Sequence, residues 1–266
     1  MSTHLNHQTS LGGSLEVASL LLAFPFVMAF FLYLLAVTLS NRHKKKWPVY
    51  RTYLWGIGII AGLITFIGPL ADNSHTDFKA HMVSHLLLGM LAPLSMALAA
   101  PMTLLLRSLP VKAARKVTKL LHSRFIGFYQ DPLVAAFLNI GGLWLLYTTN
   151  LFSLMHQHAW IFFLIHVHIF LAGYLFTISI IYIDPTSHRK TYIYRTIIFV
   201  FALAGHKILS KFIYANPPTG IDKQASEIGG MIMYYGGDAI EVCLIIVLFF
   251  QWYKDSRPKE AYTQLV

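Results

Sequence analysis

The chain has 266 residues, of which 56% are hydrophobic and only 12% are charged. A soluble domain carries about 25% charged residues, so this composition excludes an ordinary water-soluble globule. The formal net charge is +10, from 21 Lys and Arg against 11 Asp and Glu, and thirteen His are a second anomaly in so apolar a chain. The single cysteine, Cys243, excludes an intramolecular disulfide framework and thiol chemistry of the CxxC type.

Seven apolar segments are long enough to cross a bilayer, whose hydrocarbon core needs about 20 helical residues. In chain order they cover residues 15–40, 52–71, 78–106, 133–150, 157–183, 192–214 and 228–252. The third contains Pro93 and Pro101, which kink a helix but are tolerated in a bundle. We therefore predict an all-α polytopic membrane bundle of about seven transmembrane helices over residues 15–253. Residues 1–14 form an extracytoplasmic N-terminal tail in this scheme, and residues 254–266 form a cytoplasmic C-terminal tail.

The basic residues gather on one side of this topology. Seventeen of the 21 lie in the loops after the first, third and fifth spans or in the C-terminal tail: Arg42, Lys44, Lys45, Lys46, Arg51, Arg107, Lys112, Arg115, Lys116, Lys119, Arg124, Arg189, Lys190, Arg195, Lys254, Arg257 and Lys259. The positive-inside rule then places the N-terminus outside and the C-terminus in the cytoplasm. This distribution accounts for the net charge without nucleic acid, which we exclude as a partner. Within segment 107–132, basic residues at helical spacing beside apolar ones predict a short amphipathic helix on the inner surface.

The histidines show the opposite bias, since only His43, His122 and His188 fall in the cytoplasmic loops. The other ten lie on the outer side or within spans: His4, His7, His75, His81, His85, His156, His158, His166, His168 and His206. A polar ring in hydrocarbon needs a partner, so this group indicates either interhelical hydrogen bonds or a functional site in the outer leaflet.

The third span carries the first candidate site. Asp77, His81 and His85 are spaced four residues apart and form one helical stripe that enters from the outer surface. The spacing H-x-x-x-H on a helix can present two imidazoles to one metal ion.

The fifth and sixth spans bring histidines to a similar depth. His158 and His166 share a face of the fifth span, with His166 about 12 Å further in, whereas His168 points elsewhere. His206 lies about 12 Å from the outer end of the sixth span. We therefore expect His206 and one of His166 and His168 to lie level with His85.

The last span has a polar stripe of its own. Five residues on one helical face follow a spacing of four, three, four and three: Glu227, Met231, Tyr234, Asp238 and Glu241. Carboxylates in a membrane helix are costly unless they pair or line a wet cavity, so we expect Asp238 and Glu241 to face the bundle interior. Lys207 or a protonated His is the expected partner.

The residue types limit the metal that such a site could hold. Imidazole, with the thioethers of Met231 and Met233 and no thiolate, favours copper, above all Cu(I), while zinc and iron stay open. Haem is the main competitor, because two His on facing helices can also ligate its iron. Acidic residues at the outer end are too few for calcium. A retinal Schiff base is excluded because segment 228–252 contains no lysine.

Three motifs follow one another between residues 50 and 253. They are His81-Met82-Val83-Ser84-His85-Leu86-Leu87-Leu88 with Ala92-Pro93-Leu94 and Pro101, then His166-Val167-His168-Ile169-Phe170-Leu171-Ala172-Gly173-Tyr174-Leu175-Phe176, and finally Asp222-Lys223-Gln224 before Gly229-Gly230-Met231-Ile232-Met233. Together they resemble the CtaG family of caa3-type cytochrome c oxidase assembly factors. The chain departs from the family where Ala92-Pro93-Leu94-Ser95 replaces a fuller Pro-Pro-Leu-Leu and where Tyr234 stands in place of Trp.

The resemblance implies a multi-pass protein of the bacterial plasma membrane that helps to make an active haem-copper oxidase. It further implies a non-catalytic role in copper placement, with an oxidase subunit as partner and the following candidate residues: His81, His85, His166 or His168, His206, Met231 and Met233. From the residues alone two other classes stay open. A haem-binding membrane cytochrome would use the same histidines, and a proton or metal-ion transporter would use Asp238, Glu241, Lys207 and His206 as a relay.

Overall fold

The computed structural model describes residues 2–186 and 188–257, and within this part the side chains of residues 2–12 and 43 lie outside the description. The described chain is helical throughout and contains no strand, which confirms the predicted all-α class. In chain order the elements are α1 (Ser2–His43), α2 (Val49–Leu63), α3 (Pro69–Ser74), α4 (Phe78–Leu86), η1 (Leu87–Leu91), α5 (Ala92–Leu98), α6 (Pro101–Ser108), α7 (Val111–Leu121), α8 (Arg124–Tyr129), α9 (Pro132–Ala136), η2 (Phe137–Gly141), α10 (Gly142–Thr148), α11 (Leu151–Gln157), α12 (Ala159–Ile180), α13 (Tyr192–Ala215) and α14 (Lys223–Ser256). The elements η1 and η2 are single π-helical turns inside longer helices.

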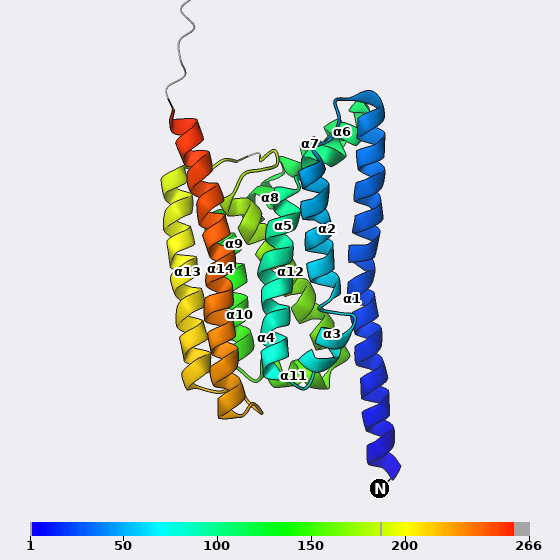
Figure 1. The fold of residues 1–266 in the computed structure, drawn as a ribbon, viewed down its shortest axis with the longest axis vertical. Helices are drawn as coiled ribbons and strands as arrows, with labels where there is room; N and C mark the ends of the chain where they lie inside the picture. Colours follow the sequence, from blue (N-terminus) through cyan, green and yellow to red (C-terminus); the bar gives the residue numbers. More distant parts are fainter. Residues whose placement is uncertain (1, 187, 258–266) are drawn as a thin grey trace, which may run out of the picture.

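Among the described residues, five stretches are long and apolar enough to cross a membrane: Gly13–Arg42, Phe78–Leu98, Ala159–Ile180, Tyr192–Ala215 and Lys223–Ser256. Pro132–Thr148 and Leu151–Gln157, bent by 79° relative to each other, make a sixth if they count as one span. The predicted count of seven is therefore not confirmed. The span that is missing is the predicted segment 52–71. Helix α2 has only 15 residues there, and its rise of about 22 Å is shorter than the hydrocarbon core of a bilayer. Figure 1 shows α2 and the short α3 following one another toward the end of the bundle where α4 begins.

The predicted third span, 78–106, is interrupted before its end. The helix runs through η1 and α5 to Leu98, and α6 starts separately at Pro101. Ala100, directly before this proline, has a left-handed φ of 52°. The proline ring disfavours right-handed helical backbone at the preceding residue, so Pro101 separates two helices where we expected it to kink one.

The first and last helices, α1 and α14, extend into the segments that we expected to be tails. Helix α1 begins at Ser2, inside the segment 1–14, and α14 continues to Ser256. Residues 258–266 of the expected C-terminal tail, Lys259 among them, lie outside the described residues, as do the side chains of His4, His7 and His43.

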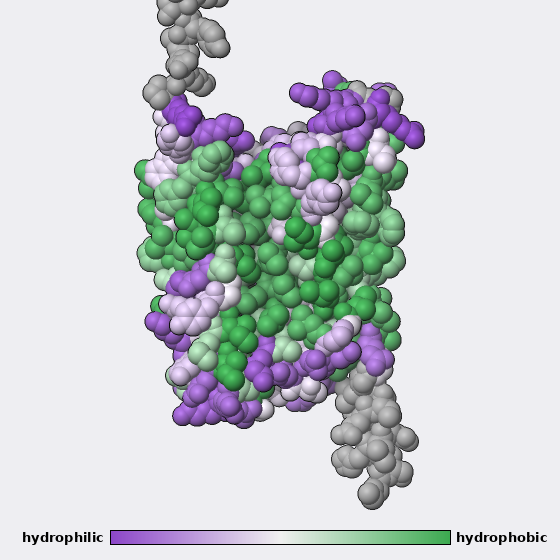
Figure 2. Space-filling view, in the orientation of Figure 1, coloured by the Kyte–Doolittle hydropathy of each residue, from purple (hydrophilic) through white to green (hydrophobic). Residues whose placement is uncertain are grey.

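The basic segments meet at one end of the bundle, which we call the basic end. Arg107 donates from Nη2 to the carbonyl of Lys45 at 2.6 Å, and the guanidinium groups of Arg51 and Arg107 lie 4.9 and 5.1 Å from the ring of Trp47. The predicted amphipathic segment forms α7 and α8, which contain no buried residue. Helix α11 and the connection between α13 and α14 lie at the other end, which we call the α11 end (Figure 1). Between the two ends the surface is an apolar band (Figure 2).

Helix α12 packs closely against the π-helical turn that follows the α4 histidines. A Cβ atom at Gly173 would collide with the carbonyl of Gly89 in η1 and would lie 3.3 Å from Cγ of Pro93. A glycine at this position lets the two backbones approach. This contact places α4 and η1 against α12 in the centre of the bundle.

Asp131 joins three segments at the basic end. It accepts hydrogen bonds from the backbone N–H of Leu133 and the hydroxyl of Tyr194, each at 3.0 Å, and pairs with Lys190 at 2.8 Å. Burial by itself raises the pKa of Asp131, but the bonds from Lys190, Leu133 and Tyr194 outweigh burial and hold this pKa below its ordinary value. Asp131 therefore stabilises the start of α9 against α13 as an ionised carboxylate.

We expect Asp131→Asn to lower stability at neutral pH and to have little effect in acid. Because the folded-state pKa is depressed, the carboxylate contributes stability above its unfolded-state pKa of about 4 and loses it as the pH falls through the folded-state pKa. The pair is partly exposed, so the loss at neutral pH is about 1 kcal/mol or less. Thermal unfolding in detergent between neutral and acidic pH tests this, and a difference from wild type that does not shrink in acid would contradict it.

Candidate metal centre

Four of the predicted histidines are buried inside the bundle. His81 and His85 lie on α4, His166 lies on α12 and His206 lies on α13, with exposed fractions between 3% and 8%. His168 is exposed, and its Nε2 atom lies 3.1 Å from the carbonyl oxygen of Leu138. Of the two candidates on α12, it is therefore His166 that faces the interior.

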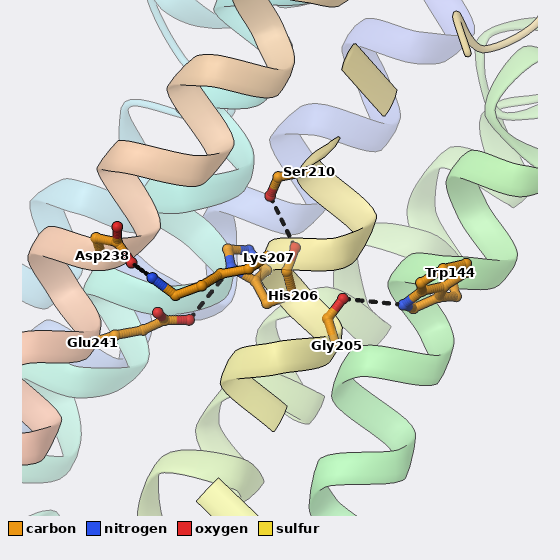
Figure 3. A network of polar contacts seen from close by, with 7 residues as sticks. All are labelled: Trp144, Gly205, His206, Lys207, Ser210, Asp238 and Glu241. Carbon is orange, nitrogen blue, oxygen red and sulfur yellow. Dashed lines mark hydrogen bonds and ion pairs between the residues drawn. The ribbon is translucent and has the colours of Figure 1, made fainter. Parts of the chain in front are cut away.

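His85 and His206 lie side by side at the centre of this group. Their ring centroids are 6.4 Å apart, and both side chains line one cavity of about 30 Å³. Glu241 of α14 lines the same cavity, with Oε1 3.3 Å from Nδ1 of His206 (Figure 3). Such a cavity has room for one or two water molecules or for one metal ion.

The ring nitrogens of this pair are unusual for their depth. Within the described part of the chain, both ring nitrogens of His85 and Nε2 of His206 have no hydrogen-bond partner, while Nδ1 of His206 has Oε1 of Glu241 within ion-pair distance at 3.3 Å. The cavity wall is otherwise mostly apolar and includes Phe176, Phe199 and Leu244. An unsatisfied buried polar group costs about 1–3 kcal/mol, so these nitrogens form a site with free ligand capacity inside an apolar core.

Helix α14 leaves room for the His206 ring at Gly237. A Cβ atom there would lie 2.5 Å from Cε1 and 3.1 Å from Nδ1 of this ring. On the other side Trp144 donates from Nε1 to the carbonyl of Gly205 at 3.2 Å, and the Ser210 hydroxyl donates to the carbonyl of His206 at 2.9 Å (Figure 3). These contacts hold α13 between α10 and α14.

His81 lies one helical turn from His85, toward the α11 end. Its Nε2 atom is 3.1 Å from the hydroxyl oxygen of Tyr147, and its ring stacks on Phe78. The centroid of the His156 ring is 6.1 Å from that of His81. His81 therefore stands between the interior pair and the histidines of the surface.

Two further histidines, His156 and His75, lie next to one another near His81, and we did not select them as site residues from the sequence. His156 on α11 lies 6.5 Å, centroid to centroid, from His75, which follows α3. Burial lowers the pKa of His75, the neighbouring His156 lowers it further, and Asp72 partly opposes the shift. In the sequence, the concentration of histidines on one side of the topology already included His75 and His156. The four-residue spacing by which we selected site residues could not pair them, because they belong to different short helices.

His166 occupies a different environment from the interior pair. Its Nδ1 atom is 2.8 Å from the carbonyl oxygen of Phe162, and its ring packs 4.0 Å from Phe162 and 5.7 Å from Phe66. It also borders an apolar pocket of about 270 Å³ between α1 and α12. These contacts are those of a satisfied, packed histidine.

The polar stripe of α14 lies at the edge of the bundle, so Asp238 does not face the interior as we expected, although it does pair with the predicted partner Lys207. Glu241 is buried beside His206, but Asp238 is about one-third exposed and pairs with the equally exposed Lys207 (Figure 3). Residues three apart on a helix differ by about 60° around the axis. This rotation is enough to turn one carboxylate inward and the other outward.

The remaining candidate residues also differ in burial and in role. Met233 is fully buried, whereas Met231 is 43% exposed on α14. Asp77 caps the start of α4 by accepting from the backbone N–H of Lys79 at 2.9 Å and also pairs with its ammonium group, which is a structural role. His158 is exposed at the start of α12.

The described residues do not contain a complete metal cage. Over residues 2–186 and 188–257, no group of three or more His, Cys, Asp or Glu side chains is arranged to hold one metal ion. Two imidazoles with a nearby carboxylate suit a weakly held ion, since two nitrogens supply part of a coordination shell.

Comparison with known families gives one match over most of the chain. The sequence profile of the family described as cytochrome c oxidase caa3 assembly factor (Caa3_CtaG) matches residues 31–255. The chain belongs to this family. The family resemblance that the three motifs indicate is thereby confirmed.

Its similar relatives include mycobacterial proteins. A protein of Mycobacterium bovis and one of Mycobacterium tuberculosis, both described as uncharacterized, are each 33% identical over 159 residues, which cover 57% of this chain and 24% of theirs. An uncharacterized protein of Mycobacterium leprae is 27% identical over 238 residues, covering 82% and 36%. The chain of this CtaG family member thus spans about a quarter to a third of the length of these relatives. No solved structure gives a significant match.

We expect Gly237→Ala to destabilise the protein and to displace the His206 ring, because the added methyl group occupies the space of that ring. The expected loss is about 1–3 kcal/mol. Gly56→Ala on α2 is the matched control, since a Cβ at Gly56 meets nothing within 4 Å. Thermal unfolding of both variants in detergent tests the prediction, and equal unfolding temperatures for the two would refute it.

Proposed function

We propose that this CtaG family member assists oxidase assembly by holding a copper ion, as cargo, between His85 and His206. The observation that carries this proposal is the pair of buried imidazoles at one cavity of about 30 Å³, where both nitrogens of His85 and Nε2 of His206 have no hydrogen-bond partner and Glu241 lies beside Nδ1 of His206. A metal ion bound there would satisfy ring nitrogens that otherwise cost stability.

The ligand chemistry favours copper. Imidazole binds copper, zinc and iron, and the lone Cys243 supplies no thiolate pair that would retain a soft metal. Met90 of η1 lines the same cavity as His85 and His206, and its thioether suits Cu(I) as a further ligand. An incomplete set of His and Met ligands releases its ion more readily than a thiolate cage, as a delivery protein requires.

The expected setting follows from the topology. The positive-inside rule assigns the basic end to the cytoplasm and the α11 end to the outer side of the bacterial plasma membrane. The partner is a haem-copper oxidase subunit in the same bilayer. In this role the protein transfers an ion and transforms no substrate.

The two alternatives receive less support from the geometry. A haem requires a pocket of several hundred Å³, far more than the space between His85 and His206. A proton relay through Lys207, Asp238, His206 and Glu241 would need all four to face the interior, but Lys207 and Asp238 are each about one-third exposed.

Competition between the purified protein and a chromogenic Cu(I) chelator tests the copper site. We expect the double variant His85→Ala/His206→Ala to lose one bound equivalent, or to bind it at least about tenfold more weakly. His168→Ala is the matched control, because this exposed ring points away from the cavity. Equal Cu(I) binding by the double variant and the control, with both folded by thermal unfolding, would rule out the interior site.

In cells whose only copy of the gene encodes the His85→Ala/His206→Ala variant, the oxidase should contain normal haem and reduced copper. The optical spectrum and metal content of the purified oxidase measure this. An oxidase with its full copper content would contradict a delivery role.

A further inference from the structure

The α11 end contains an open pocket of about 270 Å³. Its lining includes His75 and Asp77 between α3 and α4, His156 and Gln157 at the end of α11, and Thr219 and Gly220 before α14. We call this pocket the vestibule. We propose that His75 and His156 form a second copper site in the vestibule, which receives the ion before it moves inward. This inference rests on the proposed function.

The hydrogen bonding of His156 makes it ready to bind a metal. Its Nδ1 atom lies 3.0 Å from the carbonyl oxygen of Phe152. A carbonyl oxygen only accepts, so Nδ1 carries the proton of the neutral ring and Nε2 keeps its lone pair. Metal-ligating histidines commonly donate their other N–H to a carbonyl in this way.

The spacing of the two rings suits one shared ion. Metal–nitrogen bonds of about 2 Å on both sides of an ion separate two ring centres by roughly 6 Å. The centroids of His75 and His156 are 6.5 Å apart. Two imidazoles are enough for Cu(I), which accepts two-coordinate binding.

The charges around the pocket favour a cation. Asp77 lines it, and Asp72 lies close enough to act electrostatically on His75. Lys79 is paired with Asp77 at 3.7 Å and both side chains stay partly exposed. Carboxylates at the rim of an open pocket raise the local concentration of positive ions.

A continuous series of rings joins the vestibule to the interior site. The centroid separations are 6.5 Å from His75 to His156, 6.1 Å from His156 to His81 and 6.4 Å from His85 to His206. His81 and His85 are one turn apart on α4. The three separations are short enough for an ion to gain one imidazole before it leaves the previous one, and the helical turn between His81 and His85 joins them. The Tyr147 hydroxyl, 3.1 Å from Nε2 of His81, stands beside the middle of this route.

The experiment counts bound Cu(I) and follows its loading in the full-length protein. Cu(I) alone is the probe, supplied under anaerobic reducing conditions and read out by chelator competition. The vestibule variant is His75→Ala/His156→Ala, and the interior variant is His85→Ala/His206→Ala. His158→Ala is the matched control, because His158 is an exposed histidine next to the same end of α11. Thermal unfolding and size-exclusion profiles equal to those of the control show that each variant is folded.

We expect two equivalents in wild type and in the control, and one in each double variant. Loading of the interior equivalent at limiting copper should slow by about tenfold in the vestibule variant, in line with the loss of a metal-binding group. A vestibule variant that binds as much Cu(I) as the control, or that loads the interior at an unchanged rate, would overturn the inference. If instead the interior variant binds as much as wild type while the vestibule variant loses one equivalent, the vestibule site stands and the interior cargo site is wrong.

Discussion

A polar group inside an apolar helix bundle has to find a partner within the protein, because no water or lipid atom supplies one. Most buried polar side chains here meet this condition through neighbouring carbonyls or hydroxyls, as His166 does with Phe162 and His81 with Tyr147. Both ring nitrogens of His85 and Nε2 of His206 do not, although these rings lie at comparable depth. The packing around them, from Gly237 to the π-helical turn behind His85, keeps the two rings and a small cavity in place.

Polar residues that look alike in the sequence can have different surroundings in the structure. Glu241 and Asp238 stand three residues apart on α14, yet the first faces His206 and the second pairs with Lys207 near the outer surface. Their surroundings therefore differ. Glu241 borders the cavity between His85 and His206, whereas the ion pair of Asp238 with Lys207 lowers the cost of placing two charges in membrane-spanning helices.

The bent helix pair and the shortened α2 give the α11 end its shape. Because Leu151–Gln157 turns away from the preceding helix by 79°, His156 comes beside His75 and within ring contact of His81. A straight fourth span would have continued past this point. The departure from seven regular spans thus shapes the pocket that we call the vestibule, whose lining includes His75 and His156.

The sequence by itself determined the helical class, the membrane setting, the concentration of basic residues at one end and family membership, because composition, apolar length and ordered motifs are local properties of the chain. It also identified His81, His85, His206 and Glu241 as candidates. The choice of His166 over His168 as the inward residue, the outward turn of Asp238 and the place of His75 and His156 in the series were decided only by tertiary structure. These depend on the rotation of each helix about its axis and on a bend between two short helices, which arise from packing against other segments and have no periodic signature in the chain.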